Sequence, residues 1–404
     1  MAGTTGTSDA TEGEAVGDDR RVEQNTQPEP LAAAPAWPVG TPGTAGGEIS
    51  PPDERPGPRS MLLAGGMLLS SILLAVLVVL PAPYAVTMPG PTRDVLGEHE
   101  GTPLIRITGA ETFDSSGELR LTTVSATGGP GFPTSVAGAV RGWLSTDTVV
   151  LPVEQVVPSG QTQEEIDAEN SSQMTSSQEN ATVAALTWLG YEVPAVLTVA
   201  EAVEGTGAEG TVEEGDVVRT LDGTPVPDYQ TLVAGLAAVE PGATITLGVV
   251  RDGERLEVQV VTGARPDGGG ALIGILVDPA FEFPVDVQIS IDDVGGPSAG
   301  TMFALGIVDL LTPQDEANGA HIAGTGSIEV TGDVLPIGGI RQKMLGAVRD
   351  GAQWFLAPEA NCDEVVGHVP DGLRVVRIAS LDDAVEAMTA IGAGGGAALP
   401  ACGS

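Results

Sequence analysis

The chain of 404 residues is poor in basic side chains, in aromatic side chains and in cysteine. It carries 17 Lys+Arg against 55 Asp+Glu, and the formal net charge of -38 excludes nucleic acid or an anionic lipid surface as a main partner, because phosphates would be repelled. Aromatic residues make up 3% of the chain, so its cores must be built from Val, Leu, Ile and Ala. A hydrophobic share of 42% still excludes disorder throughout and supports two or three domains.

Lysine and cysteine are the scarcest of the chemically reactive residues. Lys343 is the single lysine, and the other 16 basic residues are arginines. The two cysteines, Cys362 and Cys402, allow one intramolecular pair, and the sequence leaves open whether they bond or stay free. No Gly-Lys-Ser/Thr loop is present, which excludes a Walker-type ATP site in this sequence.

The N-terminal part divides into a tail and an apolar run. Residues 1–59 are rich in Gly, Pro, Thr, Ala and acidic side chains without apolar periodicity, which predicts a disordered tail. The uncharged run MLLAGGMLLSSILLAVLVVL predicts a transmembrane helix within residues 60–82, since about 20 apolar residues cross a bilayer. A signal peptide is the alternative, but the run begins far from the N-terminus and APYAV is a poor cleavage site.

Flanking charges predict the orientation of this helix. Arg55 and Arg59 precede it, whereas Asp94 and Glu98 follow it. The positive-inside rule then places the tail in the cytoplasm and the bulk of the chain outside, as in a single-pass protein of the cell membrane. An external position would permit a disulfide between the two cysteines.

Residues 83–191 are predicted to be an accessory or connecting region. Short strands are expected at 104–110 and 118–126, followed by a polar stretch that runs into a helical segment, ATVAALTWLG. No catalytic constellation stands out in this part of the chain.

Residues 192–264 alternate short β runs with turns around one helix, expected at 229–238. The segment resembles a PDZ domain through the turns Glu214-Gly215-Asp216, Leu221-Asp222-Gly223, Pro241-Gly242 and Arg251-Asp252-Gly253. The resemblance implies that an extended peptide adds as a strand to an exposed sheet edge beside the helix. EVPAVL replaces the glycine-rich loop that holds the peptide carboxylate in such domains. A β domain that serves only as a spacer is the alternative.

Ser298 stands where a predicted strand at 283–291 meets a predicted buried helix at 299–311. Gly295 and Gly296 allow a sharp turn and a close approach of a ligand, and Pro297 suits a helix start. Free N–H groups of a first helical turn can stabilise a developing oxyanion. The serine is therefore either a helix N-cap or a nucleophile, and the stretch alone favours neither.

Lys343 is the candidate base for such a nucleophile. A buried amine loses its proton near neutral pH, whereas a guanidinium does not, and the neighbouring apolar residues of PIGGIRQKMLGAV can exclude water. An ordinary surface lysine is the alternative, although a solvated cation could equally be arginine in this chain. The histidines, His99, His321 and His368, show no recognisable Ser/His/Asp pattern.

The stretch DVGGPSAG around Ser298 and the segment GTGSIEVTGDVLPIGGIRQKMLGAVRDGAQWFLAPEAN resemble the proteolytic domain of Lon peptidases. The resemblance implies a domain over 278–392, followed by a tail at 393–404, with Ser298 as nucleophile and Lys343 as general base. It also implies that Thr325 holds the lysine. Ser327 departs from the family, which usually carries a glutamate there.

Together these features predict an α+β multidomain protein with a disordered tail, one transmembrane helix, a PDZ-like domain and a C-terminal Lon-type α/β domain. The order resembles membrane-anchored, PDZ-containing Lon-like proteases. The predicted activity is an ATP-independent serine endopeptidase that cleaves unfolded, flexible or membrane-proximal proteins outside the cytoplasm. Gly296, Pro297 and Ala299 are expected to support the catalytic residues. No cofactor and no metal are expected. Peptide or protein substrates are the expected partners, and a hexamer is implied by resemblance. The alternative is a membrane-tethered PDZ scaffold with an inactive Lon-like domain.

Overall fold

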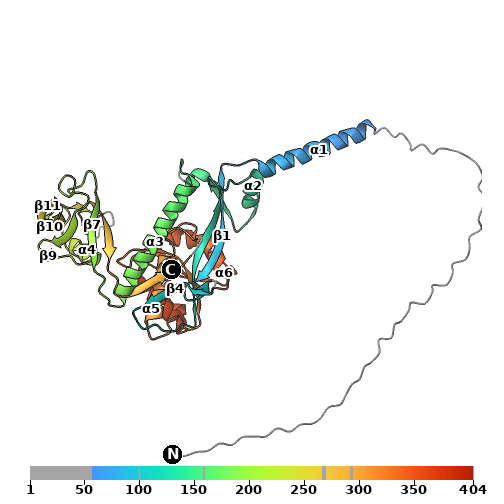
Figure 1. The fold of residues 1–404 in the computed structure, drawn as a ribbon. Helices are drawn as coiled ribbons and strands as arrows, with labels where there is room; N and C mark the ends of the chain where they lie inside the picture. Colours follow the sequence, from blue (N-terminus) through green and yellow to red (C-terminus); the bar gives the residue numbers. More distant parts are fainter. Residues whose placement is uncertain (1–56, 100, 158–159, 266–269, 292–293, 404) are drawn as a thin grey trace, which may run out of the picture. The chain divides into compact units, whose positions relative to one another are not determined.

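A computed structural model describes residues 57–403 apart from 100, 158–159, 266–269 and 292–293. Residues 1–56 of the predicted tail lie outside the described part. The predicted transmembrane segment forms helix α1, Pro58–Val79, and all of its side chains are exposed (Figure 1). Among the described residues it is the one helix long and apolar enough to cross a membrane.

The first of two six-stranded sheets has the strand order β20-β19-β16-β5-β1-β6. β5, β16, β19 and β20 run parallel to one another, while β1 is antiparallel to both β5 and β6. The strands are β1 (Tyr84–Asp94), β5 (Glu118–Thr127), β6 (Val149–Pro152), β16 (His321–Gly324), β19 (Trp354–Pro358) and β20 (Arg374–Ile378). Half of this sheet comes from the region that the sequence predicted to be a connector, so 83–191 and the C-terminal part build one layer together.

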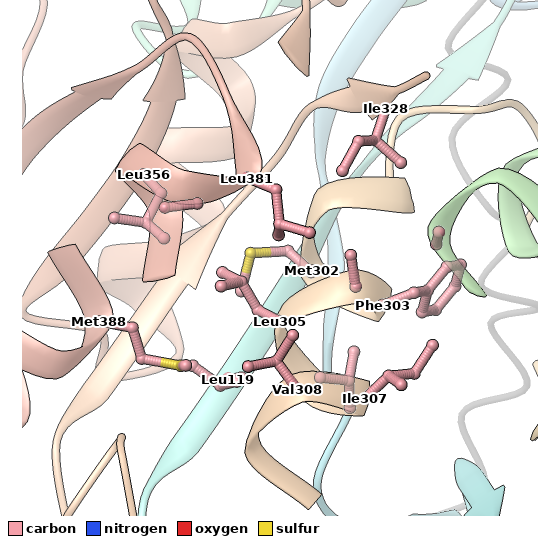
Figure 2. Close-up of a cluster of buried hydrophobic side chains, with 14 of the residues drawn as sticks. Leu119, Met302, Phe303, Leu305, Ile307, Val308, Ile328, Leu356, Leu381 and Met388 are labelled. Carbon is pink, nitrogen blue, oxygen red and sulfur yellow. The ribbon is translucent and has the colours of Figure 1, made fainter. Parts of the chain in front are cut away.

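Helix α5, Gly300–Leu311, forms the centre of the main core (Figure 2). Its side chains from Gly300 to Asp309 are all buried, as expected for a helix that is apolar on every side. It packs against the sheet through β5 and against two other helices, α3 (Gln163–Trp188) and α8 (Leu381–Gly392). Figure 2 shows residues of α5 among side chains that include Leu119 of β5 and Leu381 and Met388 of α8.

The helix α3 begins in a polar stretch that the sequence did not predict to be helical. Thr162 and Glu165 form a capping box, in which each side chain accepts a hydrogen bond from the other residue's backbone N–H. Its C-terminal half, from Ala181 to Leu186, is buried. Packing against α5 therefore extends the predicted C-terminal segment into a helix of 26 residues.

The second sheet lies in the PDZ-like region and has the order β11-β10-β8-β7-β14. Asp222 and Asp252 adopt left-handed φ values of 47° and 51°, each followed by a glycine in a tight turn between strands. The helix of this region is α4 (Tyr229–Ala237), capped by Asp228. The strands are β7 (Ala195–Ala202), β8 (Val217–Leu221), β9 (Thr224–Pro225), β10 (Thr244–Arg251), β11 (Glu254–Val261) and β14 (Ile275–Phe281). β14 joins the sheet beyond residue 264, and β7 has a strand on either side.

Short pairs and helices complete the described fold. They are the strand pairs β2 (Glu98–His99) with β3 (Thr102–Pro103), β4 (Ile105–Thr108) with β15 (Asp286–Ile289), β12 (Gly263–Ala264) with β13 (Ala271–Leu272) and β17 (Ser327–Ile328) with β18 (Val334–Leu335). The remaining helices are α2 (Val136–Leu144), η1 (Val153–Gln155), α6 (Ile340–Arg349), η2 (Glu359–Asn361), α7 (Cys362–Val365) and η3 (Gly396–Ala398).

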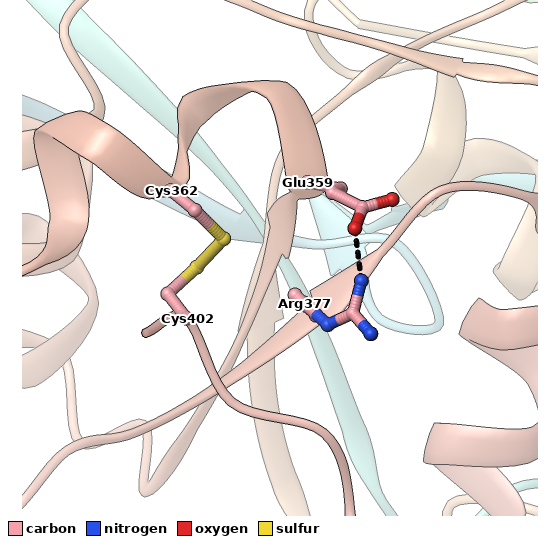
Figure 3. The surroundings of a disulfide bond; sticks show 4 residues. All are labelled: Glu359, Cys362, Arg377 and Cys402. Carbon is pink, nitrogen blue, oxygen red and sulfur yellow. Dashed lines mark hydrogen bonds and ion pairs between the residues drawn. A yellow bond between two sulfur atoms is a disulfide. The ribbon is translucent and has the colours of Figure 1, made fainter. Parts of the chain in front are cut away.

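Cys362 and Cys402 form a disulfide, which answers the question that the sequence left open (Figure 3). The bond joins the start of α7 to the C-terminal segment, 40 residues further along the chain. Glu359 and Arg377 form an ion pair nearby, also drawn in Figure 3. The C-terminal segment is thereby fixed to the domain that carries Ser298 and Lys343.

Candidate functional site

The turn that carries Ser298 is held against helix α3. Gly296 has a φ of +83°, a conformation that glycine adopts at no steric cost, and its N–H donates to the Asn170 carbonyl at 3.1 Å. A Cβ at Gly295 would come within 2.7 Å of the Asn170 side chain. The Ser177 hydroxyl donates to the Pro297 carbonyl at 2.9 Å. Both glycines therefore serve the close approach between this turn and α3.

Ser298 is not a helix cap. Helix α5 begins at Gly300 with Ala299 as its N-cap, and no side chain caps it. The predicted alternative of an N-cap serine is thus wrong, because the helix starts two residues later and the hydroxyl points to another partner. Pro297 likewise precedes the helix instead of opening it.

Lys343 lies in the first turn of α6 and is the partner of Ser298. Its Nζ lies 2.7 Å from the Ser298 Oγ, within the range of a direct hydrogen bond. The lysine is 2% exposed, and the fully buried Ile340 and Met344 flank it on the same helix. Burial lowers the pKa of Lys343 from its ordinary value of 10.5 to about 7. A neutral amine is therefore accessible at physiological pH.

Thr325 forms hydrogen bonds with both Ser298 and Lys343. It follows β16 directly and is fully buried. Its Oγ1 accepts a hydrogen bond from Lys343 Nζ at 2.9 Å and donates one to the Ser298 carbonyl at 2.9 Å. The Gly326 N–H donates to the same carbonyl at 2.9 Å. The backbone position of Ser298 and the direction of the lysine are thus fixed by one side chain.

The backbone N–H groups of Ser298 and Ala299 make no hydrogen bond with another described residue. Both residues line a cavity of about 680 Å³. Two adjacent free donors beside a hydroxyl are the arrangement that stabilises an oxyanion in acyl transfer.

The opposite walls of this cavity come largely from the N-terminal half of the sheet. The wall residues from these strands are Thr87 and Pro91 of β1, Thr122, Thr123, Val124, Ser125 and Ala126 of β5, and Val149 and Leu151 of β6. Sequence reasoning missed them, because nothing in a short Thr-rich strand indicates which other strands it will join. Three further polar residues were also missed, Gln155, Gln342 and Glu364, which line the same cavity.

Gln342 is 4% exposed, and no hydrogen bond joins its carboxamide to another described residue. Its Oε1 lies near Gly339, whose left-handed φ of 71° starts helix α6. None of the cavity-lining residues is a histidine, and the described part of the chain contains no group of three His, Cys, Asp or Glu able to hold a metal ion.

Comparison with known proteins finds two domain families in this chain. Residues 288–390 match the Lon protease (S16) C-terminal proteolytic domain, and residues 172–262 match the PDZ domain. A Lon protease of Desulfatibacillum aliphaticivorans is 35% identical over 109 residues, which are 26% of this chain and 13% of that protein. Lon protease 1 of Bacillus subtilis (strain 168) is 33% identical over 117 residues, 27% of this chain and 15% of that protein.

The chain thus spans less than a fifth of the length of these relatives. Among solved structures, the PDZ domain of an SdrC-like protein from Listeria monocytogenes matches with 17% identity and a TM-score of 0.20, covering 20% of this chain and 86% of that one.

Proposed function

From a chain that contains a Lon-type proteolytic domain and a PDZ domain, we propose an ATP-independent serine endopeptidase with Ser298 as nucleophile and Lys343 as general base. The observation that carries this proposal is the buried Lys343 Nζ at 2.7 Å from the Ser298 Oγ. Lys343 forms no ion pair with another residue of the described part of the chain, and its lowered pKa suits a base near neutral pH.

The proposed first step is attack of Ser298 on a peptide carbonyl. Lys343 in its neutral form accepts the hydroxyl proton as the Oγ–C bond forms, and becomes an ammonium. The N–H groups of Ser298 and Ala299 donate to the oxyanion of the tetrahedral intermediate. The ammonium then protonates the leaving amine as the C–N bond breaks, which leaves an acyl-serine and a neutral lysine.

Hydrolysis of the acyl-serine completes the cycle. Lys343 takes a proton from water as the water oxygen attacks the ester carbonyl. The ester C–Oγ bond then breaks, the new carboxyl terminus leaves, and the serine oxygen recovers its proton from the lysine. Thr325 accepts a hydrogen bond from the amine throughout and so keeps it directed at Ser298. Its second hydrogen bond holds the Ser298 carbonyl while the side chain reacts.

The proposed setting is the outer surface of a cell membrane. Helix α1 is the proposed single-pass anchor, with Arg59 at its cytoplasmic end and the proteolytic domain outside. The disulfide between Cys362 and Cys402 suits an oxidising compartment.

The proposed substrates are unfolded, flexible or membrane-proximal proteins, since no ATP-driven unfolding is involved. The PDZ domain is proposed to capture extended segments on a free edge of its sheet, β11 or β14. A ring of identical subunits, by resemblance a hexamer, is the proposed assembly.

Full-length protein in detergent tests the activity on casein, together with Ser298→Ala and Lys343→Arg. Both variants are expected to lose cleavage, and unchanged cleavage by either would refute the proposed dyad. An activated phosphonate that labels nucleophilic serines separates the enzyme from an inactive PDZ scaffold. Wild-type protein is expected to react at Ser298, whereas a scaffold would not react.

A further inference from the structure

Helix α2 packs with its small residues inward and leaves its large ones outside. Ala139 is 2% exposed and Gly142 is buried against the sheet. A Cβ at Gly142 would lie 2.6 Å from the Val150 side chain of β6 and 3.3 Å from Val86 of β1. The helix therefore approaches the sheet closely through small residues. An ordinary amphipathic helix instead turns its large apolar side chains toward the core.

The outward face of α2 carries the large apolar side chains. Val140, Trp143 and Leu144 are 43%, 57% and 82% exposed, and the spacing of three and four residues places them on one side of the helix. Phe132, shortly before the helix, is 70% exposed. The Trp143 ring contacts the Tyr84 ring edge-on, with centroids 5.2 Å apart. A contiguous apolar face of this kind indicates a contact with something other than water.

Two backbone hydrogen bonds join the start of α2 to the segment that follows α1. The Val136 N–H at the start of α2 donates to the carbonyl of Leu80, directly after the apolar helix α1, at 3.0 Å. The Ala82 N–H donates to the Thr134 carbonyl at 2.8 Å. Between these two bonds, Pro81 and Ser135 form an isolated antiparallel β-bridge. The exposed face therefore begins where the proposed membrane span ends.

We propose that α2 lies in the interface of the lipid bilayer, with Val140, Trp143 and Leu144 inserted among the headgroups and upper acyl chains. The inference rests on the proposed anchoring by α1. Amphipathic helices bury such faces by about 5–10 Å, and tryptophan prefers this depth. Arg141 is the one basic residue of the helix, and the chain carries a net charge of -38, so apolar contact drives the docking without anionic lipid.

This docking sets the location of the catalytic cavity. The Gly142 contact joins α2 to β1 and β6, and these strands place Thr87, Val149 and Leu151 in the cavity wall. An α2 fixed in the headgroup layer thus keeps the cavity close to the membrane surface. The substrates that it favours are polypeptide segments emerging from the bilayer.

Spin labelling tests the position of α2. The two cysteines of the chain are joined in the disulfide, so a cysteine introduced by Leu144→Cys is the only thiol to label. The full-length variant is placed in nanodiscs of phosphatidylcholine, and accessibility of the label to oxygen and to a water-soluble nickel chelate is measured. Matched variants are Leu73→Cys in α1 and Val261→Cys in β11, both exposed. Casein cleavage checks that each variant is folded.

The labels at 73 and 144 are expected to be accessible to oxygen and protected from the nickel chelate. The label at 261 is expected to be accessible to the nickel chelate. Water exposure at both 73 and 144 would overturn the anchor and the docking together. Lipid exposure at 73 with water exposure at 144 would overturn the docking alone. Dipolar broadening between labels at 144 in detergent would assign the face to a second copy of the chain and overturn the lipid assignment.

Discussion

The side-chain amide of Asn361 forms two hydrogen bonds with the backbone of Ile337. Its Oδ1 accepts from the Ile337 N–H at 2.9 Å, and its Nδ2 donates to the Ile337 carbonyl at 2.9 Å. Ile337 precedes the Gly338-Gly339 turn from which α6 and Lys343 start. Asn361 itself is 3% exposed and adjoins the disulfide-bonded Cys362. The amide therefore fixes the turn that positions the proposed base.

Replacement of this amide is expected to affect both stability and activity. In Asn361→Ala, two backbone groups of Ile337 lose their partner, at a cost of about 1–3 kcal/mol. A small displacement of α6 would lower kcat by roughly 10- to 100-fold, because proton transfer depends on the distance from Nζ to Oγ. Urea unfolding and casein cleavage measure the two effects. Full activity in Asn361→Ala would show that α6 needs no such support.

The activity is expected to rise with pH through a single ionisation near 7. Lys343 acts as a base only when neutral, and burial lowers its pKa to about 7. Below that pH the ammonium predominates and kcat/KM falls about tenfold for each pH unit, whereas above it the rate reaches a plateau. The measurement is kcat/KM for a fluorogenic peptide between pH 5 and pH 9. A midpoint near 10 would mean that the lysine is not desolvated in the working enzyme.

Removal of the lysine charge is expected to stabilise the fold. Between pH 7 and 10.5 the unfolded chain binds a proton at Lys343 that the folded chain does not, so stability falls as the pH drops through this window. Below about pH 7 the full penalty remains, at most about 5 kcal/mol. Lys343→Met should therefore unfold at higher urea concentration, with a larger gain at pH 6 than at pH 9.

Self-cleavage would disturb this comparison, so both proteins carry Ser298→Ala. The gain should exceed the loss of the hydrogen bond to Thr325, which is worth about 1 kcal/mol. An equal urea midpoint for the two proteins at pH 6 would argue against a buried amine at this position.

Gln342 is expected to affect catalysis without supporting the fold. Its side chain is 4% exposed, its carboxamide has no partner among the described residues, and the residue lines the cavity, where it can bond a peptide group of the substrate. Gln342→Met keeps the volume, so kcat/KM should fall about tenfold on every peptide while the urea midpoint stays equal or rises. A parallel loss of stability would instead assign the amide a structural role. Gln342→Asn, which keeps the amide on a shorter stem, is the matched control.

The pairing of Ser298 with Lys343 was predicted from the whole chain and not from either stretch alone. The turn before Ser298 did not separate a cap from a nucleophile, whereas the single lysine of the chain indicated a partner, and the structure brings the two side chains together. Thr325 was reached through the resemblance alone. The N-cap alternative for Ser298 failed because a one- or two-residue shift of a helix start lies beyond what composition indicates.

The walls of the site were not predictable in the same way. Strand β5 is visible as a strand, but its pairing with β16 joins Glu118 to His321, and no local pattern encodes such a partner. Glutamine is a polar residue that usually faces solvent on a helix, so the sequence does not indicate that Gln342 is buried. Only the packing of α6 against the rest of the domain buries it. The polar start of α3 became helical because its capping box and its contact with α5 outweigh its low hydrophobicity.

The first sheet is built from two distant parts of the chain, and this division also imposes an order on its folding. β5 and β16 are separated by 203 residues (321 − 118), with the whole PDZ domain between them. The edge of β5 therefore stays unpaired until β16 has been synthesised, more than 190 residues later. The proposed nucleophile and base come together only after this pairing, so we expect a nascent chain that has not reached Lys343 to have no assembled site.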